Sequence, residues 1–172
     1  MGRKKLIIGI TGSLVALALF SVIVTSGLVR PSPAEAGDNC YKIITTQSAS
    51  LLPPFNTEGE VKSGILKGST NFTGDESSIT PISDLTTPPF SSGGVVSYTG
   101  ELLFTTRKGT LTTQGVGVFE LGPFGRGNQF DRVIEGTGEF DGATGFLYFD
   151  FEADESGNNF ASTVTGTICI SD

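Results

Sequence analysis

Apolar and polar residues alternate along much of the chain after residue 36, and no stretch there keeps the period of an α-helix. In the segment 95–106, the alternate positions that include Val96, Tyr98 and Phe104 are apolar, whereas most positions between them are polar. The segment 161–171 repeats the pattern. A period of two residues is typical of a strand with one buried face. The pattern therefore predicts an all-β domain.

The alternating segments and the turn residues between them predict about eight strands. Arg107-Lys108-Gly109 and Asp141-Gly142 read as hairpin turns, and the Pro-rich segments 52–54 and 87–94 read as loops. Sequential strands joined by hairpins must hide their edges, and closure into a single antiparallel up-and-down β-barrel does so. A two-sheet sandwich is the alternative fold. The predicted strands are 40–48, 60–67, 69–80, 94–106, 110–121, 129–140, 145–153 and 160–171.

The N-terminus has a different pattern. Basic residues at positions 3–5 precede an uncharged, mostly apolar run over 6–24. Farther on, Ala34-Glu35-Ala36 is a small-x-small site of the kind that signal peptidase cleaves. Because an apolar run of this length is also able to span a bilayer, an uncleaved anchor is the alternative.

These features divide the chain into a signal peptide over 1–36 and a β-barrel domain over 37–172, with Gly37 first after the cut. We therefore expect a secreted or cell-envelope protein, anchored in a membrane if the segment is not removed. The formal net charge is −7. Such a charge repels nucleic acid and anionic lipid, so nucleic acid is not expected as a partner, and membrane contact is expected only through the N-terminal segment.

Two cysteines, Cys40 and Cys169, stand near the two ends of the predicted domain. In an oxidising compartment we expect them to form a disulfide that joins the first and last strands. The alternatives are a metal pair or a reactive thiol. Two thiolates make a poor metal site in a chain without histidine, so no metal is expected.

Glycines recur in the run EGTGEFDGATG over 135–145. With FLYFDFEAD after it and TGTIC near the end of the chain, this run resembles the C-terminal half of the allene oxide cyclase-like and dirigent-like β-barrel families, which are calycin-like. These families carry a GTG-x-F-x-GA-x-G hairpin, and the resemblance covers roughly residues 95–170. It implies a barrel that is able to hold a small apolar or aromatic molecule.

The glycines of this hairpin permit bulges, a tight turn and close backbone approach. We therefore predict a structural role for the motif. Its spacing is not that of a dinucleotide-binding loop and no helix follows it, so no cofactor is expected. The motif positions are Gly136, Gly138, Phe140, Gly142 and Gly145.

The absence of histidine excludes Ser-His-Asp and Cys-His hydrolases and leaves carboxylates, tyrosines, lysines and arginines as acid–base groups. Asp150 and Glu152 share one face of the segment 145–153, but both faces carry bulky residues. An inward Asp150 would have a raised pKa and could act as an acid or base, whereas the simpler interpretation places it in solvent. The acidic turn 154–159 offers oxygens for calcium but lacks the EF-hand pattern, so an ordinary turn is favoured.

The leading hypothesis is an exported barrel protein that binds a small hydrophobic or aromatic ligand without catalysis of its own. One alternative, drawn from the resemblance, is an allene oxide cyclase-like isomerase that acts on a lipid-derived substrate. The other is a purely structural envelope protein. An open apolar cavity with inward polar groups would favour the enzyme, a purely apolar cavity would favour binding, and a filled core would favour the structural protein. Oligomeric state is not readable from the sequence.

Overall fold

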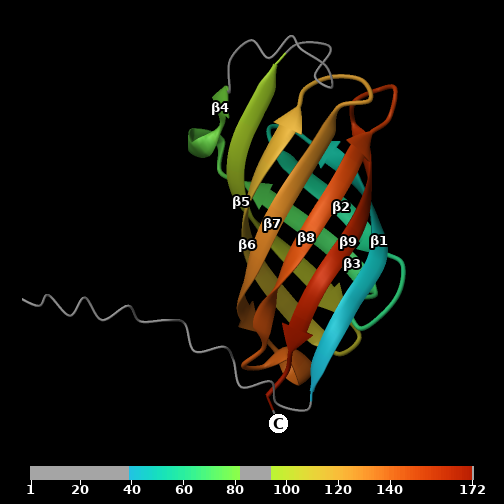
Figure 1. The fold of residues 1–172 in the computed structure, drawn as a ribbon, viewed down its shortest axis with the longest axis vertical. Helices are drawn as coiled ribbons and strands as arrows, with labels where there is room; N and C mark the ends of the chain where they lie inside the picture. The colour runs from blue at the N-terminus through green and yellow to red at the C-terminus, as the bar shows by residue number, and fades with distance from the viewer. Residues whose placement is uncertain (1–38, 82–93, 172) are drawn as a thin grey trace, which may run out of the picture. The chain divides into compact units, whose positions relative to one another are not determined.

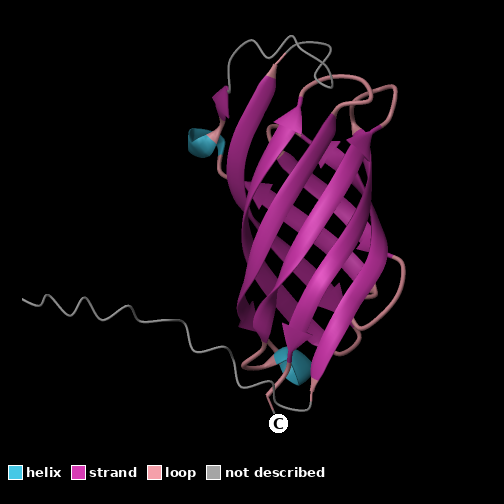
Figure 2. Cartoon of the chain, in the orientation of Figure 1, coloured by secondary structure: helices cyan, strands magenta, loops and turns pink. Residues whose placement is uncertain are grey.

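The computed structural model of the chain describes residues 39–81 and 94–171. The predicted signal peptide, its cleavage site and the predicted loop over 87–93 lie outside these ranges. Two short 3₁₀ turns, η1 (Glu76–Ser78) and η2 (Gly138–Phe140), accompany the strands. Figures 1 and 2 show the strands wound around a common axis. The strands are β1 (Cys40–Leu52), β2 (Asn56–Val61), β3 (Gly68–Gly74), β4 (Thr80–Pro81), β5 (Val95–Thr106), β6 (Gly109–Glu120), β7 (Arg126–Gly136), β8 (Thr144–Ala153) and β9 (Asn159–Cys169).

The described strands form a closed antiparallel barrel. The order β3-β2-β1-β9-β8-β7-β6-β5 places chain neighbours side by side, and pairing of β3 with β5 closes the ring. The short β4 pairs only with the start of β5. The first and last strands, β1 and β9, are adjacent (Figure 1). The eight-stranded up-and-down barrel predicted from the sequence is thus confirmed, and the sandwich alternative is wrong.

Four of the predicted strands have other bounds in the structure. β1 extends to Leu52 instead of ending at 48, β7 spans Arg126–Gly136 instead of 129–140, and β2 and β3 differ more. β2 spans Asn56–Val61 rather than 60–67, because a turn follows it in which Gly64 has a φ of +79°. Leu66 follows β2 and is buried although it is not in a strand, so its hydrophobicity misleadingly suggested that the strand continued. β3 ends at Gly74, where the side chain of Asp75 accepts a hydrogen bond from the Ser77 backbone N–H at 2.9 Å and begins η1.

The structure decides which face of β8 points inward. Leu147 and Phe149 are buried, whereas Asp150 and Glu152 are exposed. Large side chains also stand on the outer surface, where Val116, Phe130 and Tyr148 pair across β6, β7 and β8. The buried core consists mainly of Val, Leu, Ile and Phe side chains. The largest side chains that are fully buried are those of Phe104, Phe140, Leu66, Leu111, Leu147 and Ile168.

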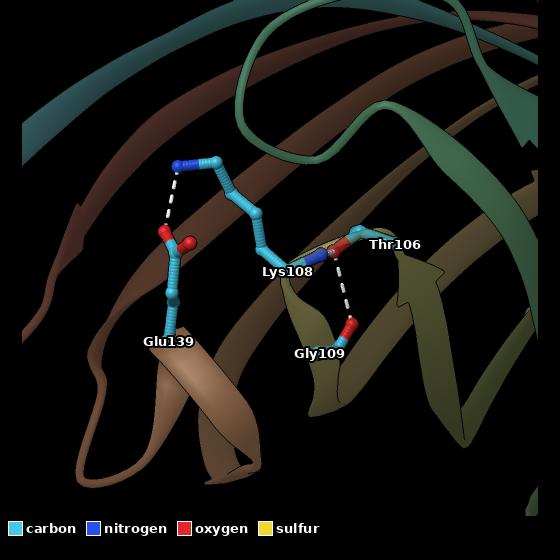
Figure 3. A network of polar contacts seen from close by, with 4 residues as sticks. All are labelled: Thr106, Lys108, Gly109 and Glu139. Atoms are coloured by element: carbon cyan, nitrogen blue, oxygen red, sulfur yellow. Dashed lines mark hydrogen bonds and ion pairs between the residues drawn. The ribbon is translucent and has the colours of Figure 1, made fainter.

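The glycine-rich hairpin closes one end of the barrel. Gly138 and Gly142 have φ values of +64° and +68° in the connection between β7 and β8, and this path brings Phe140 into the interior at 0% exposure. Glu139 accepts an ion-paired hydrogen bond at 2.6 Å from Lys108 in the β5–β6 turn (Figure 3). Thr106 at the base of the same turn donates a hydrogen bond to the Gly109 carbonyl at 2.9 Å (Figure 3).

The other two positions of the motif lie at strand ends. Gly136 is the last residue of β7, and Gly145 is the second residue of β8. A Cβ on Gly145 would lie 2.1 Å from the Thr167 carbonyl oxygen, so only glycine lets β8 and β9 approach there. The disulfide lies at the same end, where Cys40 and Cys169 face each other across β1 and β9.

Candidate functional site

A cavity of about 300 Å³ lies inside the barrel, toward the end opposite η2. Three loop segments contribute to its rim: the β1–β2 turn through Pro54, the β6–β7 loop through Leu121 and Gly122, and the β8–β9 turn through Gly157. Its volume is at the lower end of the range of small-molecule sites. The lining residues are Gln47, Ala49, Leu51, Pro54, Phe55, Thr57, Phe72, Tyr98, Leu102, Phe119, Leu121, Gly122, Gln129, Phe149, Phe151, Gly157, Phe160 and Ser162.

Two groups of aromatic rings, here called the first and second triads, line the cavity. The first consists of Phe55, Phe72 and Tyr98, with ring centroids 5.5–6.5 Å apart in edge-to-face arrangements. The second triad consists of Phe119, Phe151 and Phe160, with centroids 5.5–5.9 Å apart. The first triad belongs to the β5-β3-β2-β1 arc and the second to the β9-β8-β7-β6 arc. The two triads therefore stand on opposite walls.

A chain of hydrogen bonds runs along one wall. The Tyr98 hydroxyl donates to Gln129 Oε1 at 2.8 Å, and Gln129 Nε2 donates to Asp131 Oδ1 at 2.7 Å. The Thr113 hydroxyl donates to Asp131 Oδ2 at 2.5 Å. Tyr98 and Gln129 reach the cavity, whereas Asp131 is 0% exposed and lies behind Gln129. Both carboxyl oxygens of Asp131 are therefore already hydrogen-bonded.

The register of three strands makes this chain possible. Tyr98 on β5 pairs with Gly117 on β6, which pairs in turn with Gln129 on β7. A Cβ on Gly117 would lie 2.3 Å from the Tyr98 ring, so a glycine there lets the phenol cross β6 and reach Gln129. Gly115 leaves space for the Asp131 side chain in the same way, because a Cβ there would lie 1.9 Å from the carboxyl Oδ1.

Burial changes the acidity of two groups in the chain. Burial raises the pKa of the Asp131 carboxyl above its usual value, while the hydrogen bonds from Thr113 and Gln129 act in the opposite direction. Burial also raises the pKa of the Tyr98 phenol well above its usual range, and the nearby Asp131 charge adds to the effect. Tyr98 is therefore a protonated hydrogen-bond donor at neutral pH and is a poor general base.

The remaining polar groups of the wall are uncharged. Gln47 Nε2 donates to the Thr70 hydroxyl at 2.8 Å, and Ser162 and Thr57 add hydroxyl groups. No Asp, Glu, Lys or Arg is among the described residues that line the cavity. Asp131 and Glu120, which are buried carboxyl residues, are not part of that lining.

The carboxylates that the sequence singled out lie away from this wall. Asp150 is on the exposed face of β8, so the hypothesis of an inward Asp150 is wrong. Asp154 organises the β8–β9 turn, where Oδ1 accepts from the Ser156 hydroxyl at 2.6 Å and Oδ2 accepts from Asn159 Nδ2 at 2.7 Å. These bonds hold the pKa of Asp154 well below its usual range. Across 39–81 and 94–171, no group of three or more acidic, Cys or His side chains is placed to hold a metal ion.

Sequence reasoning placed Tyr98 on an inward face but missed Gln129 and Asp131. On β7 the alternate positions Gln129, Asp131 and Val133 point inward, while Phe130 and Ile134 point outward. On β7, two large hydrophobic side chains therefore lie on the outer surface, while two polar side chains point into the barrel. The glycines at 115 and 117 were the available signal, but their meaning depends on a register that the sequence does not state.

Within the described ranges, no helix combines the length and hydrophobicity that a membrane crossing needs. Comparison of the sequence with protein-family models and with curated proteins finds no match. Among solved structures, a pterocarpan synthase dirigent protein is similar at a TM-score of 0.31 and 12% identity, over 78% of this chain and 97% of that chain. Similarity at that level leaves the fold and the site to be argued from the residues of this chain.

Proposed function

We propose that this protein binds a small, largely apolar molecule in the barrel cavity. The observation that carries the proposal is the unfilled space of about 300 Å³ between the two aromatic triads. Protein interiors are normally close-packed, because every unfilled space loses dispersion contacts. An open, mainly apolar space of this size is what a small hydrophobic ligand would fill on binding.

Export is part of the proposal. Disulfides persist in oxidising compartments, and the Cys40–Cys169 bond is therefore typical of a protein that leaves the cytoplasm. The basic start and apolar run of the N-terminus support the same interpretation. A secreted or envelope protein with an apolar cavity is suited to carrying or sequestering a molecule of low water solubility.

Binding is favoured over a purely structural role, since a structural barrel of this size would be expected to pack its interior fully. The choice between binding and catalysis is less clear-cut, because polar side chains do point into the cavity. The one carboxyl group near them is not free to react, however: Gln129 joins Tyr98 to Asp131 and stands between that carboxyl and the cavity. A general acid or base must lie within hydrogen-bond reach of the reacting atom or one water away from it. An isomerase is therefore the second candidate, and the buried Asp131 is the observation that supports it.

The test uses N-phenyl-1-naphthylamine, an uncharged probe whose fluorescence rises in apolar surroundings. We expect saturable binding of one probe per chain. Ala49→Phe, which fills the cavity from β1, should abolish that binding. Ser48→Phe is the matched control, because Ser48 is the neighbouring residue on the exposed face of the same strand.

A second pair keeps the test valid if Ala49→Phe does not fold. Ser162→Leu points into the cavity from β9, and Thr163→Leu points out of the barrel beside it. Absence of saturable binding, or binding that survives both inward substitutions in folded protein, contradicts the proposed function. Deuterium uptake into carbon positions of a bound ketone in heavy water, lost in Asp131→Asn, would favour the isomerase instead.

A further inference from the structure

The chemistry of the cavity wall restricts the ligand further, provided that the proposed function holds. The wall offers apolar surface, made of the rings of the two triads, Phe149 and several aliphatic side chains, and a small set of amides and hydroxyls. Among its described residues there is no cation to pair with an anionic ligand. There is also no exposed carboxylate in the lining to pair with a cationic ligand.

Asp131 does not supply the missing charge. Its Oδ1 accepts from Gln129, its Oδ2 accepts from Thr113, and its side chain has no exposure to the cavity. A cation in the cavity would meet the Gln129 amide before it met the carboxyl group. An anion would meet no compensating charge, and a buried ion without a partner is strongly disfavoured.

The uncharged polar groups still have hydrogen-bonding capacity to offer. The Gln129 amide uses one N–H for Asp131 and its oxygen for Tyr98, which leaves the second N–H of the same nitrogen. Gln47 uses Nε2 for Thr70 and keeps its Oε1. Asp131 fixes the direction of the Gln129 amide, because a carboxyl oxygen that accepts a hydrogen bond requires the NH₂ end to face it.

We infer that the cavity selects an uncharged ligand, whose apolar body lies between the two triads and whose oxygen bonds to the amide and hydroxyl groups of the wall. The ionised form of a similar skeleton is rejected. The cavity is thus suited to neutral ketones, ethers or alcohols of low polarity and is unsuited to free fatty-acid carboxylates.

Three naphthalene compounds of similar size test this selection by displacing N-phenyl-1-naphthylamine at neutral pH: 2-acetylnaphthalene, 2-naphthoate and the (2-naphthyl)methylammonium ion. We expect the neutral ketone to displace the probe at a concentration about tenfold or more below that of either ion. This comparison uses the unaltered protein and does not depend on any variant.

A charge placed at the rim should alter the selection. Leu121 lines the cavity at 42% exposure, so a lysine there keeps its ammonium group near water. Leu121→Lys should lower the preference for the ketone over 2-naphthoate by about threefold or more relative to Leu121→Gln, the uncharged control.

The outcomes separate this inference from the proposed function. Equal displacement by the ketone and either ion, or tighter binding of an ion, overturns the inference while binding itself stands. A probe that binds but is not displaced by the ketone also contradicts it. If the probe does not bind at all, the proposed function fails and the inference fails with it.

Discussion

At the scale of single residues, the buried carboxyl of Asp131 links the cavity wall to the pH dependence of stability. It is fully buried and accepts hydrogen bonds from two uncharged donors, the Thr113 hydroxyl and the Gln129 amide. Burial disfavours its charged form, and the two hydrogen bonds recover part of that loss. The carboxyl group therefore orders the wall of the cavity at a cost in stability that depends on pH.

Asp131→Asn should remove that pH dependence. The pKa of Asp131 is higher in the folded protein than the unfolded value of 3.8, so the folded state binds the proton more tightly. Well below pH 3.8 the carboxyl is protonated in both states and does not lower the free energy of unfolding. As the pH rises toward the pKa of the folded state, the carboxyl ionises first in the unfolded state, so the folded state loses stability. The variant should gain stability relative to the unaltered protein as the pH is raised from about 4 to about 7, measured by urea unfolding at both values.

The control is Asp150→Asn on the exposed face of β8, which should change stability by about 0.5 kcal/mol or less at either pH. If Asp131→Asn instead loses relative stability on going to neutral pH, the two hydrogen bonds outweigh burial and the carboxyl is held in its charged form.

At the scale of elements, the two ends of the barrel are built differently. One end is closed by the β7–β8 connection, in which η2 inserts Phe140, and by the disulfide between β1 and β9. The other end is bordered by loops and contains the cavity. We therefore expect the free energy of unfolding to depend mainly on contacts at the closed end, and a ligand to bind at the open end.

Phe140→Ala tests the importance of the closed end. Phe140 is fully buried, and removal of a buried phenylalanine ring costs about 3–5 kcal/mol, because the space that it leaves is only partly refilled. Phe124→Ala, at 58% exposure in the β6–β7 loop, is the matched control and should cost much less. Thermal unfolding of both variants measures the difference; equal losses would mean that Phe140 does not act as a plug.

Removal of the disulfide by Cys40→Ser with Cys169→Ser should lower the free energy of unfolding by up to about 4–5 kcal/mol, because the bond closes a loop of 129 residues in the unfolded chain. The β1–β9 ladder extends to the Ser50–Asn159 pair without it, so the variant should still fold. Chemical denaturation measures the loss, and the reduced unaltered protein should have the same midpoint. An unchanged midpoint in the double variant would contradict the loop-closure argument.

At the scale of the whole molecule, each long strand of the described ranges has a neighbour on both sides, because β3 pairs with β5 and β1 pairs with β9. The cavity lies toward the end that the β1–β2, β6–β7 and β8–β9 connections border. The covalent link between the first and last strands of the barrel persists under oxidising conditions.

Processing of the N-terminus is the prediction that belongs to this scale. Protein recovered from the envelope or the medium should begin at Gly37, as read by N-terminal sequencing. A first residue of Met1 in a membrane fraction would replace cleavage with an anchor. Full-length protein confined to the cytoplasm would contradict both.

The sequence by itself determined the strand content, most of the turns and the pair of cysteines. Alternation identified β5 and β9 to within two residues at each end, and Arg107-Lys108 marked the β5–β6 hairpin. These are local properties: a period of two and a turn residue are visible without knowledge of what lies opposite. The disulfide was predicted from two cysteines near the ends of the domain and an oxidising destination, and it joins the first and last strands as expected.

Only the tertiary structure decided which faces point inward and what meets inside. On β7 both faces carry apolar residues, so alternation could not choose the face with Gln129 and Asp131. Their bond to Tyr98 depends on the pairing of Tyr98 with Gly117 and of Gly117 with Gln129, a register fixed by three strands together. The cavity likewise depends on how far rings from opposite arcs extend toward one another. Such distances arise from closure of the whole barrel, and no single segment of the sequence contains them.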